Sequence, residues 1–140
     1  MKPDRFEQAR VFIVDDDPGV RQMIARMVRS VGLEPETFTC VKEFLAGWEP
    51  SQPGCLVLDV RMPGESGLDL QEQLVRSGAS LPIVFISGHG NVPMSVRAMK
   101  HGAVDFLEKP FDDQALLDAI HAALARDAER RASERLRADA

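Results

Sequence analysis

Paired cysteines and long apolar runs are both missing from this sequence of 140 residues. Its two cysteines, Cys40 and Cys55, lie without CxxC spacing and without clustered histidines. They predict two small buried side chains, and neither a disulfide framework nor a cysteine-based metal site. No apolar stretch approaches the roughly 18 residues that a membrane-spanning helix requires, and the N-terminus lacks the apolar centre of a signal peptide. We therefore expect a cytoplasmic protein without a membrane partner.

The sequence also lacks the excess of positive charge that is typical of nucleic-acid-binding proteins. Its net charge of −5 argues against DNA or RNA binding by the whole chain. The hydrophobic share of 44% and the charged share of 28% are typical of a globular protein, and the length indicates one domain. The charge is uneven, because residues 126–140 carry five arginines against four acidic residues.

Five apolar runs alternate with five stretches of helical periodicity. The runs lie near residues 11–14, 34–38, 56–58, 81–86 and 104–107. The helices are expected to begin after an Asp17 cap with proline at the first position, at Thr39 or Cys40, at a Ser66 capping box, near Val92, and after an Asp112 cap. This alternation predicts an α/β fold of the (βα)5 type, with a parallel sheet, right-handed crossovers and helices on both faces.

The fourth helix has an apolar stripe of Val92, Val96, Met99 and Ala103. About half of this stripe is expected to be core, because one face of the helix has to cover the sheet.

After Leu124 the apolar spacing of the last helix gives way to a charged sequence of helix-forming residues. Charge pairs at i,i+4, such as Asp127 with Arg131, favour a helix that runs on into solvent without a core of its own. We therefore predict a domain of residues 1–125 and a charged helical extension or linker of residues 126–140.

Reactive side chains follow the predicted strands at their carboxyl ends. Asp15 and Asp16 follow the first strand, Asp59 the third, Ser87 the fourth and Lys109 the fifth. Because the carboxyl ends of parallel strands meet at one edge of a sheet, these side chains are expected to converge at the place where open α/β sheets bind ligands. Taken alone, Asp59 could equally cap the turn that follows it.

The chemistry of this set indicates phosphoryl transfer. Closely packed carboxylates stay ionised only beside a cation, and their hard oxygen atoms suit Mg²⁺, which also accepts phosphate oxygens. Lys109 adds a second positive charge, and Ser87 adds a hydroxyl donor. A carboxylate nucleophile, a metal, a lysine and a hydroxyl are the parts that such a site needs.

Three segments together resemble the receiver (REC) domain of two-component response regulators, most closely the FixJ-type branch with LuxR/NarL-type output. They are VDDDP at 14–18, LDVRMPGESGLDL at 58–70, and ISGHGNVPMSVRAMKHGAVDFLEKPF at 86–111. The resemblance covers about residues 9–125. It implies a flavodoxin-like (CheY-like) three-layer sandwich with parallel sheet order 2-1-3-4-5.

The resemblance also implies roles for the acidic residues and their neighbours. Asp59 matches the phosphoacceptor and is also one of the expected Mg²⁺ ligands. Asp15 and Asp16 match the acidic pair that holds Mg²⁺, with Asp16 as a direct ligand and Asp15 acting through water. The backbone carbonyl of Arg61 matches the remaining protein ligand. Lys109 matches the lysine that contacts the phosphoryl group, and the bond between Lys109 and the following proline matches one that is cis in the family.

Two switch positions follow from the same resemblance. Ser87 matches the switch hydroxyl and Phe106 the switch aromatic, although a phenylalanine ring lacks a phenolic oxygen and cannot form a hydrogen bond. His89 and Arg61 flank the acceptor and are candidates for tuning hydrolysis of the phosphate, while His89 could equally be a plain loop residue.

The implied function is signalling, with the chain as a phosphoacceptor and not an enzyme. A sensor histidine kinase would donate the phosphoryl group, and the face made by the fourth helix, fifth strand and fifth helix would respond, with a homodimer through that face as one outcome. Control of transcription would require a C-terminal DNA-binding domain outside these residues. A stand-alone receiver acting through protein contacts is the alternative.

Two other classes of protein, an enzyme and a nucleotide-binding domain, fit the residues less well. A Mg²⁺-dependent phosphohydrolase would need a second acid two residues after Asp59, where Arg61 stands. A nucleotide-binding domain would need a glycine-rich loop after the first strand, where the sequence has three consecutive aspartates.

Overall fold

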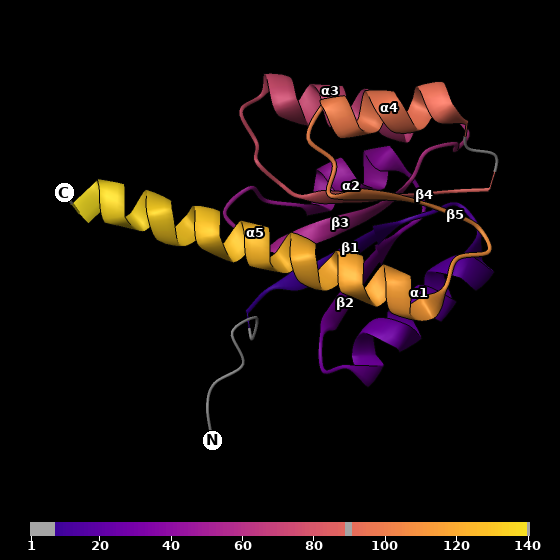
Figure 1. Ribbon diagram of the computed structural model, residues 1–140, viewed down its shortest axis with the longest axis horizontal. Helices are drawn as coiled ribbons and strands as arrows, with labels where there is room; N and C mark the ends of the chain where they lie inside the picture. The colour runs from indigo at the N-terminus through magenta and orange to yellow at the C-terminus, as the bar shows by residue number, and fades with distance from the viewer. Residues whose placement is uncertain (1–7, 89–90, 140) are drawn as a thin grey trace.

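A computed structural model of the chain describes residues 8–88 and 91–139. Its centre is a five-stranded parallel sheet in the order β2-β1-β3-β4-β5, as the resemblance implied (Figure 1). The strands are β1 (Arg10–Val14), β2 (Glu34–Phe38), β3 (Gly54–Asp59), β4 (Ile83–Ser87) and β5 (Asp105–Glu108). Each lies within two residues of its predicted apolar run at either end.

The helices connect consecutive strands and cover both faces of the sheet. In Figure 1, α3 and α4 lie above the sheet, and α1 and α5 lie below it. The bounds are α1 (Pro18–Ser30), α2 (Val41–Gly47), α3 (Gly67–Arg76), α4 (Val92–Lys100) and α5 (Asp113–Asp139). This is the predicted three-layer arrangement.

The predicted helix caps are confirmed by hydrogen bonds. The side chain of Asp17 accepts from Gly19 N at 2.8 Å. Ser66 Oγ accepts from the backbone N–H three residues later, and Asp112 does the same for the last helix. The sequence reading missed Asn91, whose side chain caps α4.

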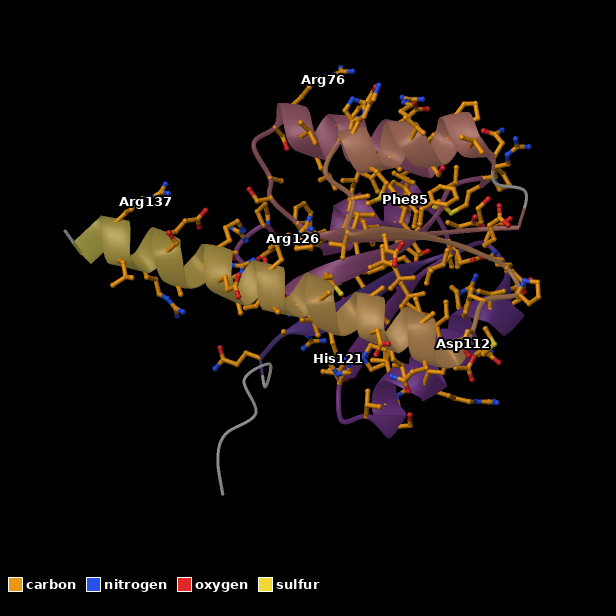
Figure 2. The ribbon with its side chains drawn as sticks, viewed as in Figure 1. Arg76, Phe85, Asp112, His121, Arg126 and Arg137 are labelled. Carbon is orange, nitrogen blue, oxygen red and sulfur yellow. The ribbon has the colours of Figure 1, made fainter. Side chains whose placement is uncertain are left out.

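The core is divided into two clusters by the sheet. Alternate residues of β1 show the division, because Val11 and Ile13 pack with α1 and α5 while Phe12 packs with α2, α3 and α4. Figure 2 shows Phe85 of β4 on the α3 and α4 side of the sheet. The three central strands are buried on both faces, which explains why their sequences are continuous apolar runs.

The cysteines match the prediction in part. Both are free thiols, and Cys55 is fully buried in β3, where burial raises its pKa. Cys40, at the start of α2, is only partly buried.

The predicted apolar stripe of α4 does not form the core, which is a correction. Val92, Val96 and Met99 are 73%, 43% and 47% exposed, and within α4 only Ala98 is buried. Ala103, just beyond the helix, is the one member of the stripe in the core. The small Ala98 side chain lets the helix backbone approach the sheet closely, and a reading based on the largest apolar residues selects the opposite face.

The last helix continues without a break to Asp139, and its extension is attached to the sheet layer. Asp127 is 2% exposed and accepts a hydrogen bond from Gly54 N at 3.0 Å. The predicted pair with Arg131 is confirmed, with Nε 2.9 Å from Asp127 Oδ2. Arg131 also donates to three consecutive carbonyls of residues 50–52.

Among the described residues, none of the helices is apolar over a length that could cross a membrane.

Candidate functional site

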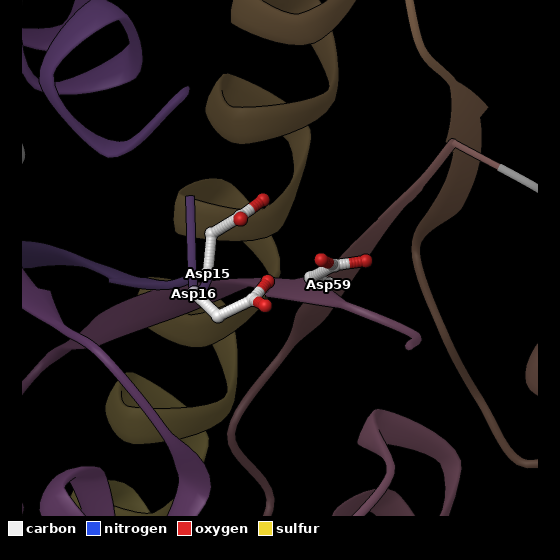
Figure 3. Close-up of side chains that lie close together, drawn as sticks. All are labelled: Asp15, Asp16 and Asp59. Carbon is white, nitrogen blue, oxygen red and sulfur yellow. The ribbon is translucent and has the colours of Figure 1, made fainter. Parts of the chain in front are cut away.

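Three carboxylates converge at the carboxyl ends of β1 and β3. Each of Asp15, Asp16 and Asp59 can offer an oxygen atom that lies within 4.8 Å of the others (Figure 3). The strand register explains this, because β1 and β3 are adjacent and Val14 pairs with Leu58. Asp15 and Asp59 are buried, whereas Asp16 is exposed. Hard oxygen atoms in this arrangement can hold a metal ion.

Every polar group of Asp15 has a partner. Its Oδ1 accepts from Asp17 N at 2.8 Å, and its Oδ2 accepts from Lys109 Nζ at 2.9 Å. Its backbone carbonyl accepts from the Arg21 guanidinium at 2.7 Å. Asp17, predicted only as a helix cap, therefore also orients the carboxylate. The contact of Arg21 was not predicted, because an arginine in the first turn of a helix has no sequence signal for this role.

Lys109 lies between the two buried carboxylates. Its Nζ is 2.9 Å from Asp15 Oδ2 and 3.5 Å from Asp59 Oδ2. Burial acts to lower the pKa of Lys109, but the hydrogen bond and charge of Asp15, together with the charge of Asp59, outweigh it and the pKa is raised. The lysine is therefore a permanent cation at the centre of the site. The peptide bond between Lys109 and Pro110 is cis, as the resemblance implied.

Asp59 is 4% exposed, and its surroundings oppose its ionisation. Its pKa is raised to about 6, first by burial and then by the charge of Asp15, while the charge of Lys109 and the backbone N–H of Arg61 act in the opposite direction. The Arg61 N–H lies 3.3 Å from Asp59 Oδ1. At a pH near 6, Asp59 is therefore present in both its charged and its neutral form.

Gly67 allows α3 to begin directly against the acceptor strand. A Cβ atom at this position would lie 2.5 Å from the backbone oxygen of Asp59, too close for any other residue without a shift of the backbone. The sequence reading gave Gly67 no role, because its need for glycine arises from this tertiary contact.

The two predicted switch residues come from neighbouring strands. Ser87 is fully buried at the end of β4, and its backbone oxygen accepts from Lys109 N at 2.8 Å. Phe106 of β5 is partly buried, with its ring centroid 6.1 Å from that of Phe85. Their switch roles stay predictions. His89 lies outside the described residues.

The Arg61 side chain reaches α4. Its guanidinium lies 3.9 Å from Met94 Sδ. The structure thus brings Asp15, Asp16, Asp59 and Lys109 into one site. The role of the Arg61 side chain in tuning hydrolysis and the role of the Arg61 carbonyl in metal binding stay predictions.

Comparisons with known proteins agree on one family. The family model described as the response regulator receiver domain matches residues 11–121. Nodulation protein W of Bradyrhizobium diazoefficiens is 54% identical over 128 residues, covering 91% of this chain and 56% of that protein. Transcriptional regulatory protein FixJ of Azorhizobium caulinodans is 45% identical over 133 residues, covering 95% of this chain and 63% of that protein.

Among solved structures, the response regulator StyR is similar with a TM-score of 0.90 and 53% identity. The match covers 94% of this chain and 67% of StyR. The chain therefore spans between half and two thirds of the length of these relatives.

Proposed function

The chain belongs to the response regulator receiver domain family, and from this premise we propose that Asp59 accepts a phosphoryl group from the phosphohistidine of a sensor histidine kinase. The observation that carries the proposal is the convergence of Asp15, Asp16 and Asp59 around Lys109, with Lys109 Nζ within 3.5 Å of both buried carboxylates. Such a site combines a carboxylate nucleophile with a lysine that is placed to neutralise the negative charge of a phosphoryl group.

Asp59 acts as the nucleophile in its ionised form. With a pKa of about 6, its carboxylate is mostly charged at neutral pH. One carboxylate oxygen attacks phosphorus in line, a new O–P bond forms, the P–N bond to the kinase imidazole breaks, and the electron pair of that bond stays on the imidazole nitrogen. The Arg61 N–H holds Oδ1, which leaves Oδ2 on the side of Lys109.

Asp15 and Asp16 are suited to hold Mg²⁺ beside the acceptor. Asp16, which is exposed, would be a direct ligand and Asp15 would act through water, while Asp59 and the backbone carbonyl of Arg61 would complete the protein ligands. When bound, Mg²⁺ supplies positive charge that neutralises phosphoryl oxygens. The donor set fits this ion, because carboxylate and carbonyl oxygens are its preferred protein ligands.

Lys109 changes partner when the acceptor is phosphorylated. Its Nζ is now shared between Asp15 and Asp59, and a phosphoryl group on Asp59 would offer oxygen atoms of greater negative charge within reach. The lysine therefore stabilises the product as well as the transfer.

The response begins at Ser87 and Phe106. The Ser87 hydroxyl moves toward the phosphoryl oxygens, and the Phe106 ring turns into the space that it leaves. The face of α4, β5 and α5 repacks as a consequence and favours a homodimer. In support, α4 already presents exposed Val92, Val96 and Met99 on this side of the molecule.

For output, we favour control of transcription through a DNA-binding domain that follows the receiver. The support is that a relative 45% identical is named a transcriptional regulatory protein and is longer than this chain. A stand-alone receiver acting through protein contacts is the second candidate. In both cases the domain acts as a phosphoacceptor in the cytoplasm and not as a turnover enzyme. The phosphohydrolase alternative is disfavoured by Arg61, whose side chain is directed to Met94.

The proposal is tested by incubating the protein with acetyl phosphate and Mg²⁺ and measuring the intact mass. We expect wild type to gain one phosphoryl group, EDTA to prevent the gain, and Asp59→Asn to show none. Equal phosphorylation of Asp59→Asn and wild type would overturn the assignment of the acceptor.

A further inference from the structure

A cavity of about 230 Å³ lies between the C-terminal part of α5 and two loops. Its lining comes from three segments: Trp48 and Pro50 before β3, residues 78–81 before β4, and Arg130, Arg131 and Glu134 of α5. Because both loops precede their strands, the cavity is at the amino ends of the sheet, where α5 continues past it (Figure 1). The carboxylates of the phosphorylation site are at the opposite ends of the strands.

Two residues that line this cavity carry buried N–H groups without an acceptor. Among the described residues, three buried side-chain polar atoms have no hydrogen-bond partner, and two of these are Nε1 of Trp48 and Nε of Arg130. Both atoms are donors, and a buried donor without an acceptor is destabilising. An oxygen acceptor held in the cavity would therefore supply what both residues lack.

The two side chains are held in place by other contacts. The ring of Trp48 stacks on that of Phe44, with centroids 5.3 Å apart and planes 17° from parallel. Arg130 Nη2 lies 2.9 Å from Oδ1 of the buried Asp127. Side chains that are already ordered lose little conformational freedom when they bind a ligand. The cavity is thus preorganised on both of its donor-bearing walls.

The charges around the cavity leave room for one anion. Arg130 and Arg131 are balanced by Asp127 and Glu134, and Asp127 is bonded to both arginines. Glu134 is different, because its side chain is 56% exposed and both of its oxygens lie 3.0 Å from Arg130 Nη1. An exposed ion pair costs little to break. When Glu134 turns into solvent, one positive charge becomes available to an incoming carboxylate.

We propose that this cavity binds a small carboxylic acid in its ionised form, with its carboxylate oxygens accepting from Trp48 Nε1 and Arg130 Nε. The remaining walls include Pro50 and Leu81, which favour a ligand with a short apolar body over a fully polar anion such as phosphate. The site is independent of Asp59. A bound acid would join the C-terminal part of α5 to the loops before β3 and β4.

The test uses the indole N–H of Trp48, the only tryptophan of the chain. The full chain is titrated at neutral pH with butyrate and, separately, with n-butanol, which has the same number of carbon atoms but no carboxylate. In ¹H–¹⁵N NMR spectra we expect butyrate to give saturable shifts of the Trp48 indole and Arg130 Nε–H resonances, and butanol to give none. Equal shifts with both probes, shifts that grow without saturation, or no shift with butyrate would overturn the proposal.

Arg130→Lys tests the proposed donor, because lysine keeps the positive charge but has no N–H at the Nε position. We expect the Kd for butyrate to rise about tenfold, which corresponds to the loss of one hydrogen bond to a charged group. The control is Arg135→Lys, at an exposed position on the same helix outside the cavity lining, which should bind as wild type. An Arg130→Lys protein with the wild-type Kd would contradict the assignment.

Glu134→Gln tests the competition for Arg130 in the opposite direction. The variant keeps the shape of the side chain and removes its charge, so butyrate should bind about threefold more tightly, the effect of one exposed ion pair. Weaker binding would show that the anion does not replace Glu134. Thermal unfolding of each variant establishes that it is folded, and the exposed Glu134 position keeps the test available if Arg130→Lys does not fold.

Discussion

Asp59 combines a reactive role with an unfavourable resting environment. Its carboxylate is buried beside Asp15, and its pKa is raised from 3.8 to about 6 chiefly by burial. The folded protein therefore binds a proton at Asp59 more tightly than the unfolded chain does. The stability that this proton contributes is present below pH 4 and is lost as the pH rises through 6.

The pH dependence of stability gives a prediction for Asp59→Asn in EDTA. At pH 8 the variant should be more stable than wild type by roughly 1–3 kcal/mol, because the neutral asparagine removes the cost of keeping a charged carboxylate buried. Near pH 3.5 the two proteins should unfold at nearly the same urea concentration. Glu65→Gln, at an exposed position, serves as a control with no such gap. A gap of equal size at both pH values would contradict the account.

At the residue scale, the sequence predicts which side chains meet where strand position determines it. Asp15, Asp16, Asp59 and Lys109 meet because they end strands of one parallel sheet. Arg21 and Gly67 escaped prediction for a physical reason, since each is defined by a contact with a residue of another element and not by its own neighbours in sequence.

At the scale of elements, the extension of α5 is more than a solvated helix. The sequence predicts its helical state and the pair of Asp127 with Arg131, because both depend on local spacing. It does not predict that Asp127 is buried, since the partner Gly54 lies 73 residues away in the chain. We propose that the folded unit of the receiver extends beyond residue 125, at least to Arg131.

Removal of the Asp127 carboxylate tests this boundary. In Asp127→Ala the buried Gly54 N–H loses its carboxylate acceptor, and Arg130 and Arg131 each lose one of their acceptors. We expect a loss of roughly 3 kcal/mol in the free energy of unfolding, measured with urea, because one partner of a buried ionic contact is left behind. Glu134→Ala, which removes an exposed acceptor of Arg130, should lose less than about 1 kcal/mol. Similar losses for both variants would show that the extension is not anchored at Asp127.

The helix α4 shows where periodicity alone misleads at this scale. Two stripes on α4 have apolar residues at i,i+4 spacing, and the stripe with Val92 and Val96 is the larger. The structure buries the other one, through Ala98, because a small side chain permits close packing on the sheet. Size and apolar character could not decide which face turns inward.

For the whole molecule, the fold followed from the sequence because the alternation of apolar runs and helices leaves few arrangements open. Short connections and right-handed crossovers give a parallel sheet, and the order β2-β1-β3-β4-β5 came from the resemblance. That order places the acidic residues after β1 and β3 next to each other.

Assembly of the whole molecule is the second proposed response. We expect wild type to elute earlier from a size-exclusion column after addition of beryllofluoride and Mg²⁺, as a dimer through α4, β5 and α5. Val96→Glu, on the exposed face of α4, should stay monomeric, while Val75→Glu, exposed on α3, should behave as wild type. An elution volume that beryllofluoride leaves unchanged in wild type would count against this route.

The central claim is that Asp59 carries the phosphoryl group, and chemical mapping of the phosphorylated protein tests it most directly. Borohydride reduces an aspartyl phosphate to homoserine, and peptide mass spectrometry then locates the changed residue. After treatment with acetyl phosphate and Mg²⁺, we predict homoserine at position 59 and unchanged aspartate at positions 15 and 16. Homoserine at position 15 or 16, with position 59 unmodified, would contradict the account.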